Sequence, residues 1–254
     1  MLKIYISSPD WENFNISSII GEFFYMKTLP KITQEFIKEI ESNSASGDVT
    51  NVIELPSGRK LVFSVFPFVF PIEADFSGSS NIIYRNLLGL EGKSVLDMGT
   101  GSGVQAVFAS IAGASEVHAV DVDSNAVECA YTNIISNGIE NVFVYKSDLF
   151  DSVPKGKKFD LIIANLPIVD FDLSSDWQKS ILDPDFNIHK RFFSEARNYL
   201  LDSGKIFLSH SDFGDVPYFE SLVDQAGLKI LRKIPYNKDH GGINITWYFY
   251  ELGL

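Results

Sequence analysis

The feature that most constrains the fold is an alternation of apolar segments with segments of helical period, which begins near residue 90. The apolar segments are typical of strands, and the segments between them carry apolar residues at positions i, i+3, i+4 and i+7. Each helix therefore buries one stripe against a sheet. Two such stripes are Val104, Val107, Phe108 and Ile111, and Phe219, Leu222, Val223 and Ala226. The alternation predicts a parallel sheet with helices on both faces.

Seven segments are predicted to be strands. They are "KSVLDMG", "EVHAVDV", "VFVYKSD", "FDLIIAN", "KIFLSHS", "LKILRKI" and "ITWYFYEL". The last two are joined only by "PYNKDHGG", which leaves no room for a helix, so they should pair antiparallel. The prediction is an α/β fold with a seven-stranded, mostly parallel sheet and an antiparallel last strand.

The first 90 residues have a different pattern. A helix is predicted between Trp11 and Phe24, followed by an amphipathic helix that carries Ile32 and Ile40. The stretch "NVIELPSGRKLVFSVFPFVF" is typical of two strands that turn at Ser57 and Gly58. We therefore divide the chain into a small α+β appendage, residues 1–90, and an α/β domain, residues 91–254.

Composition excludes several classes of protein. No run of about 18 apolar residues is present, and the start "MLKIYISSPDWE" is unlike a signal peptide, so we expect a cytoplasmic protein without a membrane span. The single Cys129 cannot form an internal disulfide, and four scattered histidines give no metal-ligand spacing, so no metal is expected. The net charge of −12 disfavours an extensive nucleic-acid-binding face.

Ligands of open α/β sheets bind beyond the carboxyl ends of the strands, so the residues that end each strand are informative. The first strand of the domain ends in "VLDMGTGSGV", where Asp97 precedes Gly99, Gly101 and Gly103. Such glycines allow a tight turn and a close approach of the backbone to a ligand at a helix N-terminus. A dinucleotide-binding turn has the pattern G-x-G-x-x-G. Counted from Gly99, that pattern needs a glycine at position 104, where this chain has Val104. The alternative is that the glycines serve the turn alone.

Acidic residues end the next two strands. A carboxylate at Asp121 can accept hydrogen bonds from both hydroxyls of a ribose, with Val122 as an apolar neighbour. Asp121 as a simple helix cap is the alternative, but Asp123 stands closer to the helix. Asp148 ends the third strand and can accept from an exocyclic amine such as that of adenine, or it is a solvated loop residue.

Together, Asp97, the three glycines, Asp121 and Asp148 resemble the class I S-adenosylmethionine-dependent methyltransferases, over about residues 91 to 230. The segment from Ala119 to Asp151 is similar to the branch that contains release-factor glutamine, ribosomal-protein and rRNA guanine N-methyltransferases. The resemblance implies a Rossmann-like fold and S-adenosyl-L-methionine as cofactor. The implied cofactor-binding residues are Asp97, Gly99, Thr100, Gly101, Gly103, Asp121, Val122, Asp148, Leu149 and Asn165.

The fourth strand ends at Asn165-Leu166-Pro167-Ile168, where that branch has N-P-P-[YF]. The resemblance implies that the side-chain oxygen of Asn165 and the carbonyl of Leu166 accept both hydrogens of a planar amine. Pro167 favours an extended conformation at Leu166. Ile168 replaces the aromatic ring, which disfavours a nucleobase acceptor. In the alternative interpretation Asn165 only ends the strand.

Further substrate-contacting residues are predicted at two places. The stretch "VFPFVFPIEADFSGSS" resembles the approach to the cofactor in the same branch, which would bring Phe70, Asp75, Gly78 and Ser79 to the cofactor or substrate; the alternative is a surface turn. Ile168 and His210, at the ends of the fourth and fifth strands, are also predicted to contact the substrate. For His210 the alternative is a histidine packed in the protein interior.

The predicted function is transfer of a methyl group from S-adenosylmethionine to a nitrogen of a protein side chain or small metabolite, with the appendage helping to form the substrate pocket. Two alternatives stay open. One is an RNA or DNA base N-methyltransferase, and the other is a nonenzymatic cofactor-binding or partner-regulating module. A nicotinamide dehydrogenase is disfavoured by Val104.

Overall fold

A computed structural model gives the fold of the protein and describes residues 34, 38, 48–72, 78–170, 180–240 and 243–254. The helix predicted between Trp11 and Phe24 lies outside these residues, as does Asp75. The first strands described, β1 (Val49–Glu54) and β2 (Lys60–Val65), form an antiparallel hairpin. Gly58 adopts φ +81° in the turn between them, which confirms the predicted hairpin.

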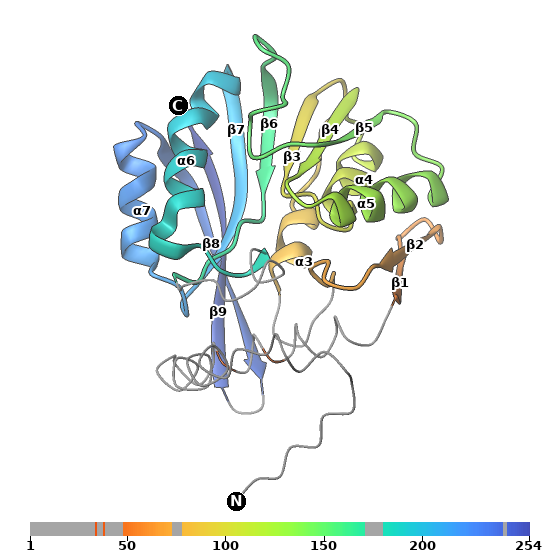
Figure 1. The fold of residues 1–254 in the computed structure, drawn as a ribbon, viewed down its shortest axis with the longest axis horizontal. Helices are drawn as coiled ribbons and strands as arrows, with labels where there is room; N and C mark the ends of the chain where they lie inside the picture. The colour runs from red at the N-terminus through yellow and green to blue at the C-terminus, as the bar shows by residue number, and fades with distance from the viewer. Residues whose placement is uncertain (1–33, 35–37, 39–47, 73–77, 171–179, 241–242) are drawn as a thin grey trace, which may run out of the picture.

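A seven-stranded sheet forms the centre of the molecule, in the order β5-β4-β3-β6-β7-β9-β8 (Figure 1). All pairs among β5, β4, β3, β6 and β7 are parallel, and β9 runs antiparallel to both of its neighbours. The predicted fold class is therefore confirmed. The strands are β3 (Ser94–Met98), β4 (Glu116–Asp121), β5 (Val142–Lys146), β6 (Phe159–Ala164), β7 (Leu200–Ser211), β8 (Lys229–His240) and β9 (Ile243–Gly253).

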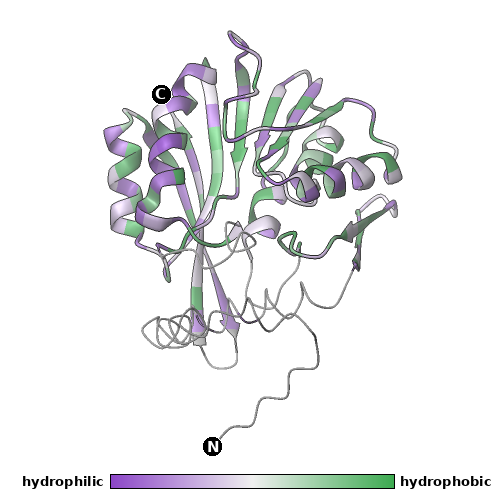
Figure 2. Ribbon diagram, in the orientation of Figure 1, coloured by the Kyte–Doolittle hydropathy of each residue, from purple (hydrophilic) through white to green (hydrophobic). Residues whose placement is uncertain are grey.

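Helices cover both faces of the sheet because successive strand residues point to opposite sides. On β3 and β6, Val95 and Leu161 pack with α4 and α5, whereas Leu96 and Ile162 pack with α6 and α7. In Figure 2 the covered strands are largely hydrophobic, while the helices carry hydrophilic residues on their outer sides. The helices are α3 (Ser79–Tyr84), α4 (Val104–Ile111), α5 (Ser124–Ser136), α6 (Asn187–Ala196) and α7 (Val216–Gln225).

Asn133 on α5 and Asn137, which caps the end of that helix, hold the hairpin against the α/β domain. The side chain of Asn133 accepts from the backbone N–H of Ser64 at 2.8 Å and donates to its carbonyl at 2.8 Å. Asn137 binds the N–H and carbonyl of Val62 in the same way, at 2.9 and 2.7 Å. Asn133 also donates to the carbonyl of Ser102 at 2.9 Å, so the hairpin, α5 and the turn after β3 share one hydrogen-bond network.

The structure differs from the sequence prediction at the last two strands. Residues Pro235 to His240, expected as a connection, continue β8 and pair with β9 as far as Ile243. Because β8 is an edge strand, Pro235 can be accommodated without a backbone donor. No helix in the described part of the chain is long and apolar enough to cross a membrane.

Candidate active site

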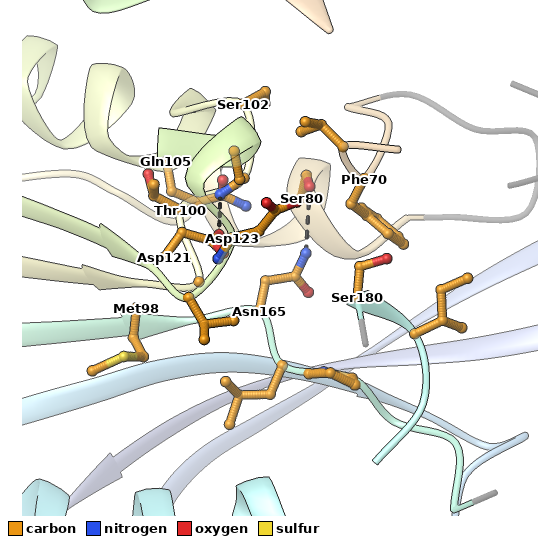
Figure 3. Close-up of a pocket in the computed structure, with 18 of the residues that line it drawn as sticks. Phe70, Ser80, Met98, Thr100, Ser102, Gln105, Asp121, Asp123, Asn165 and Ser180 are labelled. Carbon is orange, nitrogen blue, oxygen red and sulfur yellow. Dashed lines mark hydrogen bonds between the residues drawn. The ribbon is translucent and has the colours of Figure 1, made fainter. Parts of the chain in front are cut away.

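A pocket of about 730 Å³ opens at the carboxyl ends of β3, β4, β5 and β6, where α/β sheets bind their ligands (Figure 3). Its lining also includes residues 67–70 and the start of α3. Most residues predicted for the site line this pocket. They are Phe70, Ser79, Gly99, Thr100, Gly101, Asp121, Val122, Asp148, Leu149, Asn165, Leu166, Pro167 and Ile168.

The turn between β3 and α4 forms one wall of the pocket. Gly99, Gly101 and Gly103 adopt φ values of +69°, +54° and +80°, which favour glycine. A Cβ at Gly99 would have no neighbour within 4 Å, so the backbone there is open to the pocket. At Gly103, which caps α4, a Cβ would lie 3.1 Å from Ala130, so this glycine lets α4 approach α5.

Asp97 is hydrogen-bonded to this turn but is not among the residues that line the pocket. Its carboxylate accepts a hydrogen bond from the Thr100 hydroxyl at 2.6 Å. Burial raises the pKa of Asp97 to about 7, while the bond from Thr100 opposes that rise. Asp97 therefore contacts the turn through its hydrogen bond with Thr100 and lies outside the pocket lining.

Asp121 ends β4 at the pocket surface. One of its carboxylate oxygens accepts from the N–H of Gly101 at 2.9 Å and the other from the N–H of Asp123 at 3.0 Å. Burial raises the pKa of Asp121, and these backbone bonds oppose the rise. Each oxygen keeps lone-pair capacity for a further donor, so the carboxylate is rigidly placed to bind two neighbouring hydroxyls.

Asp148, Val122 and Leu149 lie on the adjoining wall. Arg191 donates to one carboxylate oxygen of Asp148 at 2.9 Å, and the Asp148 side chain is 56% exposed. Val122 is exposed and Leu149 buried. These residues offer a polar acceptor and apolar surface beside Asp121, as a purine would require.

Asn165 ends β6 on the opposite side of the pocket, and serines hold its side chain. Its amide nitrogen donates to the hydroxyl of Ser79 at 3.2 Å. The same nitrogen lies 3.5 Å from the hydroxyl of Ser80 (Figure 3). Its amide oxygen accepts from Ser209 on β7 at 2.9 Å. Since an amide oxygen has two lone pairs, one stays available to a ligand.

Comparison with known proteins finds similarity to methyltransferases. The family model of ribosomal protein L11 methyltransferase (PrmA) matches residues 84–171. The ribosomal protein L11 methyltransferase of Lactobacillus johnsonii is 36% identical over 141 residues, which is 56% of this chain and 38% of that protein. The matched part thus spans less than half the length of this curated relative.

Two solved structures share the fold. The ribosomal protein L11 methylase of Lactobacillus delbrueckii subsp. bulgaricus has a TM-score of 0.52 and 23% identity, over 67% of this chain and 73% of that chain. Methanocaldococcus jannaschii Trm5, solved with adenosine, has a TM-score of 0.57 and 15% identity, over 82% and 57%. The chain has the class I S-adenosylmethionine-dependent methyltransferase fold. The resemblance predicted from the sequence is therefore confirmed.

The predicted site residues that do not line the pocket include Asp97, Gly103 and His210. His210 lies farthest from its prediction because its side chain is on the other face of the sheet. His210 is fully buried, and its ring lies 4.5 Å from that of Phe219 on α7. Burial lowers the pKa of His210 to about 3. Strand residues alternate between faces, so the neighbouring Ser209, and not His210, reaches the pocket side of the sheet and contacts Asn165. His210 does not line the pocket.

The polar or aromatic pocket residues that the sequence interpretation missed include Ser80, Gln105 and Trp247. Ser80 follows Ser79 on α3, and Trp247 lies on β9; both line the pocket. Gln105, the second residue of α4, is only 4% exposed and also lines the pocket. A polar residue within the otherwise apolar start of α4 was the available signal for Gln105.

Proposed function

We propose that the protein is an S-adenosylmethionine-dependent methyltransferase whose acceptor is a nitrogen of a protein side chain. The observation that carries this proposal is that one pocket contains the open glycine turn, Asp121 and Asn165 at the ends of β3, β4 and β6. The same elements of the fold thus offer a nucleoside site at one end of the pocket and an amine site at the other.

The residues present fit the cofactor. Asp121 accepts from the two ribose hydroxyls with oxygens that its backbone partners already hold in place. Asp148 accepts from the exocyclic amine of adenine, and the side chains of Val122 and Leu149 cover the ring. Gly99 leaves the backbone of the turn uncovered, which would let the cofactor approach it closely. When bound, the cofactor supplies a methyl group on a sulfonium, a good leaving group.

Asn165 and Leu166 orient the acceptor. The remaining lone pair of the Asn165 side-chain oxygen and the carbonyl of Leu166 accept the two hydrogens of the nitrogen nucleophile. The serines around Asn165 fix its side chain. The lone pair of the acceptor nitrogen is therefore held toward the transferred methyl group, and little orientational freedom is lost during the reaction.

The proposed acceptor is a basic protein. The relatives named above include methyltransferases of a ribosomal protein. A net charge of −12 attracts a positively charged protein over long range and repels nucleic acid. The cytoplasm is the corresponding location. Phe70 and Ser79, within the predicted appendage, line the pocket, which supports a role of residues 1–90 in binding the acceptor.

A second candidate is methylation of a nucleobase, and the pocket lining favours it in one respect. Ile168 lacks the aromatic ring of related motifs, but Phe68, Phe70 and Trp247 bring aromatic side chains to the same pocket. Aromatic surfaces stack on flat bases. A nucleobase acceptor would show binding that weakens steeply as salt increases, because phosphate contacts release counterions.

The test is transfer of a labelled methyl group from S-adenosylmethionine to fractionated protein, RNA and metabolite pools of the source cell. We expect label in a protein fraction. Asn165→Ala should abolish transfer while the affinity for S-adenosylhomocysteine stays within about twofold, because Asn165 acts on the acceptor. Asn198→Ala, at an exposed position outside the pocket lining, is the matched control. Label in RNA alone would favour the second candidate, and unchanged transfer by Asn165→Ala would contradict the role of Asn165.

A further inference from the structure

Gln105 is a polar side chain that is buried at the wall of the pocket. It is 4% exposed and lines the pocket together with Thr100, Ser102 and Asp121 (Figure 3). Its side-chain nitrogen Nε2 has no hydrogen-bond partner among the residues that the structure describes. Buried amide groups are nearly always paired, so an unpaired one at a pocket surface indicates that a ligand supplies the acceptor.

The backbone around Gln105 favours an acceptor with negative charge. Gln105 is in the first turn of α4, whose amide N–H groups and helix dipole make that end of the helix positive. The capping residue Gly103 has no side chain to bind these N–H groups, and the first turn contains no acidic residue. The donor of Gln105 and the positive helix end thus lie at the same pocket wall.

We propose that Nε2 of Gln105 donates a hydrogen bond to the carboxylate of the amino-acid portion of S-adenosylmethionine. This inference rests on the proposed function. The cofactor has one anionic group, and that group is the carboxylate. Asp121 binds to Gly101 near the start of the glycine turn, while Gln105 follows the end of the turn. The ribose at Asp121 and the amino-acid portion at Gln105 therefore extend along opposite parts of the same turn.

Gln105 would then determine which nucleosides the pocket accepts. A nucleoside without the amino-acid portion leaves the buried amide unpaired, and a site built to hydrogen-bond a group discriminates against analogues that lack it. A variant with an apolar side chain in place of Gln105 would bind the adenosine portion of the cofactor equally well. It would lose the preference for the complete cofactor over the nucleoside alone.

Calorimetric titration with two probes tests this inference. S-adenosylhomocysteine carries the carboxylate, and 5′-methylthioadenosine has the same nucleoside and thioether without it. Gln105→Met keeps the length of the side chain and removes the donor. We expect it to weaken binding of S-adenosylhomocysteine about tenfold and to change binding of 5′-methylthioadenosine less than twofold. Gln105→Glu should weaken S-adenosylhomocysteine further, because two carboxylates repel.

The matched control is Gln225→Met, which makes the same exchange at an exposed position on α7 and should affect neither ligand. Without ligand, Gln105→Met should melt at a higher temperature than the wild type, because it removes an unpaired buried amide; this readout also shows that the variant folds. Equal weakening of both ligands, or unchanged binding of S-adenosylhomocysteine, would overturn the assignment.

Two further outcomes separate the possible failures. If Gln105→Met binds S-adenosylhomocysteine normally but requires a higher acceptor concentration in the methyl-transfer assay, the acceptor supplies the carbonyl or carboxylate, and the assignment to the cofactor is wrong. If the wild-type protein binds neither probe, the proposed function itself fails.

Discussion

Asp97 is a carboxyl group enclosed below the glycine turn, and its protonation is coupled to folding. Burial raises the pKa of Asp97 in the folded protein to about 7, well above the ordinary value of an exposed aspartate. A carboxyl group with a raised pKa binds its proton more tightly when folded. Its contribution therefore lowers the free energy of unfolding as pH rises from about 4 to about 7, with no further change above that range.

The prediction concerns Asp97→Asn, which replaces the titrating group by a neutral amide of similar size. The difference in unfolding free energy, variant minus wild type, should rise between pH 4 and pH 7, by up to roughly 4 kcal/mol. Urea unfolding of both proteins at several pH values measures this difference. A difference that stays constant across the range would show that Asp97 is ionised in the folded protein at all these pH values.

Residues differ in how far their roles can be predicted from the sequence. Gly99, Gly101 and Asp121 were predicted for the site from their places at the ends of strands, and all three line the pocket. Ser209 and Gln105 were missed for physical reasons. Ser209 donates a hydrogen bond to Asn165, which is 44 residues away, and Nε2 of Gln105 is distinguished by having no partner among the described residues, which three-dimensional packing reveals.

At the scale of elements, the approach of α4 to α5 depends on Gly103. Gly103→Ala would put a methyl group 3.1 Å from Ala130 and a side chain at φ +80°. Gly138→Ala, at φ +67° with no neighbour within 4 Å, carries the backbone cost alone. We expect Gly103→Ala to destabilise the protein by about 1–3 kcal/mol more than Gly138→Ala, since overpacking is added to the strain.

Urea unfolding of the two alanine variants gives this comparison. Equal losses would mean that Gly103 serves only the backbone conformation of the turn. Because Gly103 caps the start of α4, Gly103→Ala should displace this helix and thereby weaken ligand binding. Gly138→Ala should bind the ligand normally.

The elements themselves were predicted well where periodicity is strong, as in α4, α7 and the strands of the parallel sheet. The prediction was wrong about the length of β8, because Pro235 and the polar residues after it are typical of a loop. An edge strand needs neither a complete set of backbone donors nor apolar side chains on its outer side, so local pattern cannot identify it. The role of Asn133 and Asn137 was also missed, since their partners lie on a distant hairpin.

At the scale of the whole molecule, alternation of strands and helices was sufficient to predict the parallel sheet, its two covered faces and the antiparallel last strand. The carboxyl ends of neighbouring parallel strands meet at one edge, and for that reason residues between Gly99 and Asn165 form a single pocket. Periodicity does not indicate which helix and strand residues turn toward that pocket, as His210 and Ser209 illustrate.

The central claim is that this pocket binds S-adenosylmethionine through Asp121. Its most direct test is calorimetric titration with S-adenosylhomocysteine of the wild type, Asp121→Ala and, as control, Asp224→Ala at an exposed position on α7. The account predicts one binding site per chain, an affinity about 100-fold weaker in Asp121→Ala because two hydrogen bonds to a charged group are lost, and no change in the control. Absence of binding in the wild type, or equal affinity in Asp121→Ala, would contradict it.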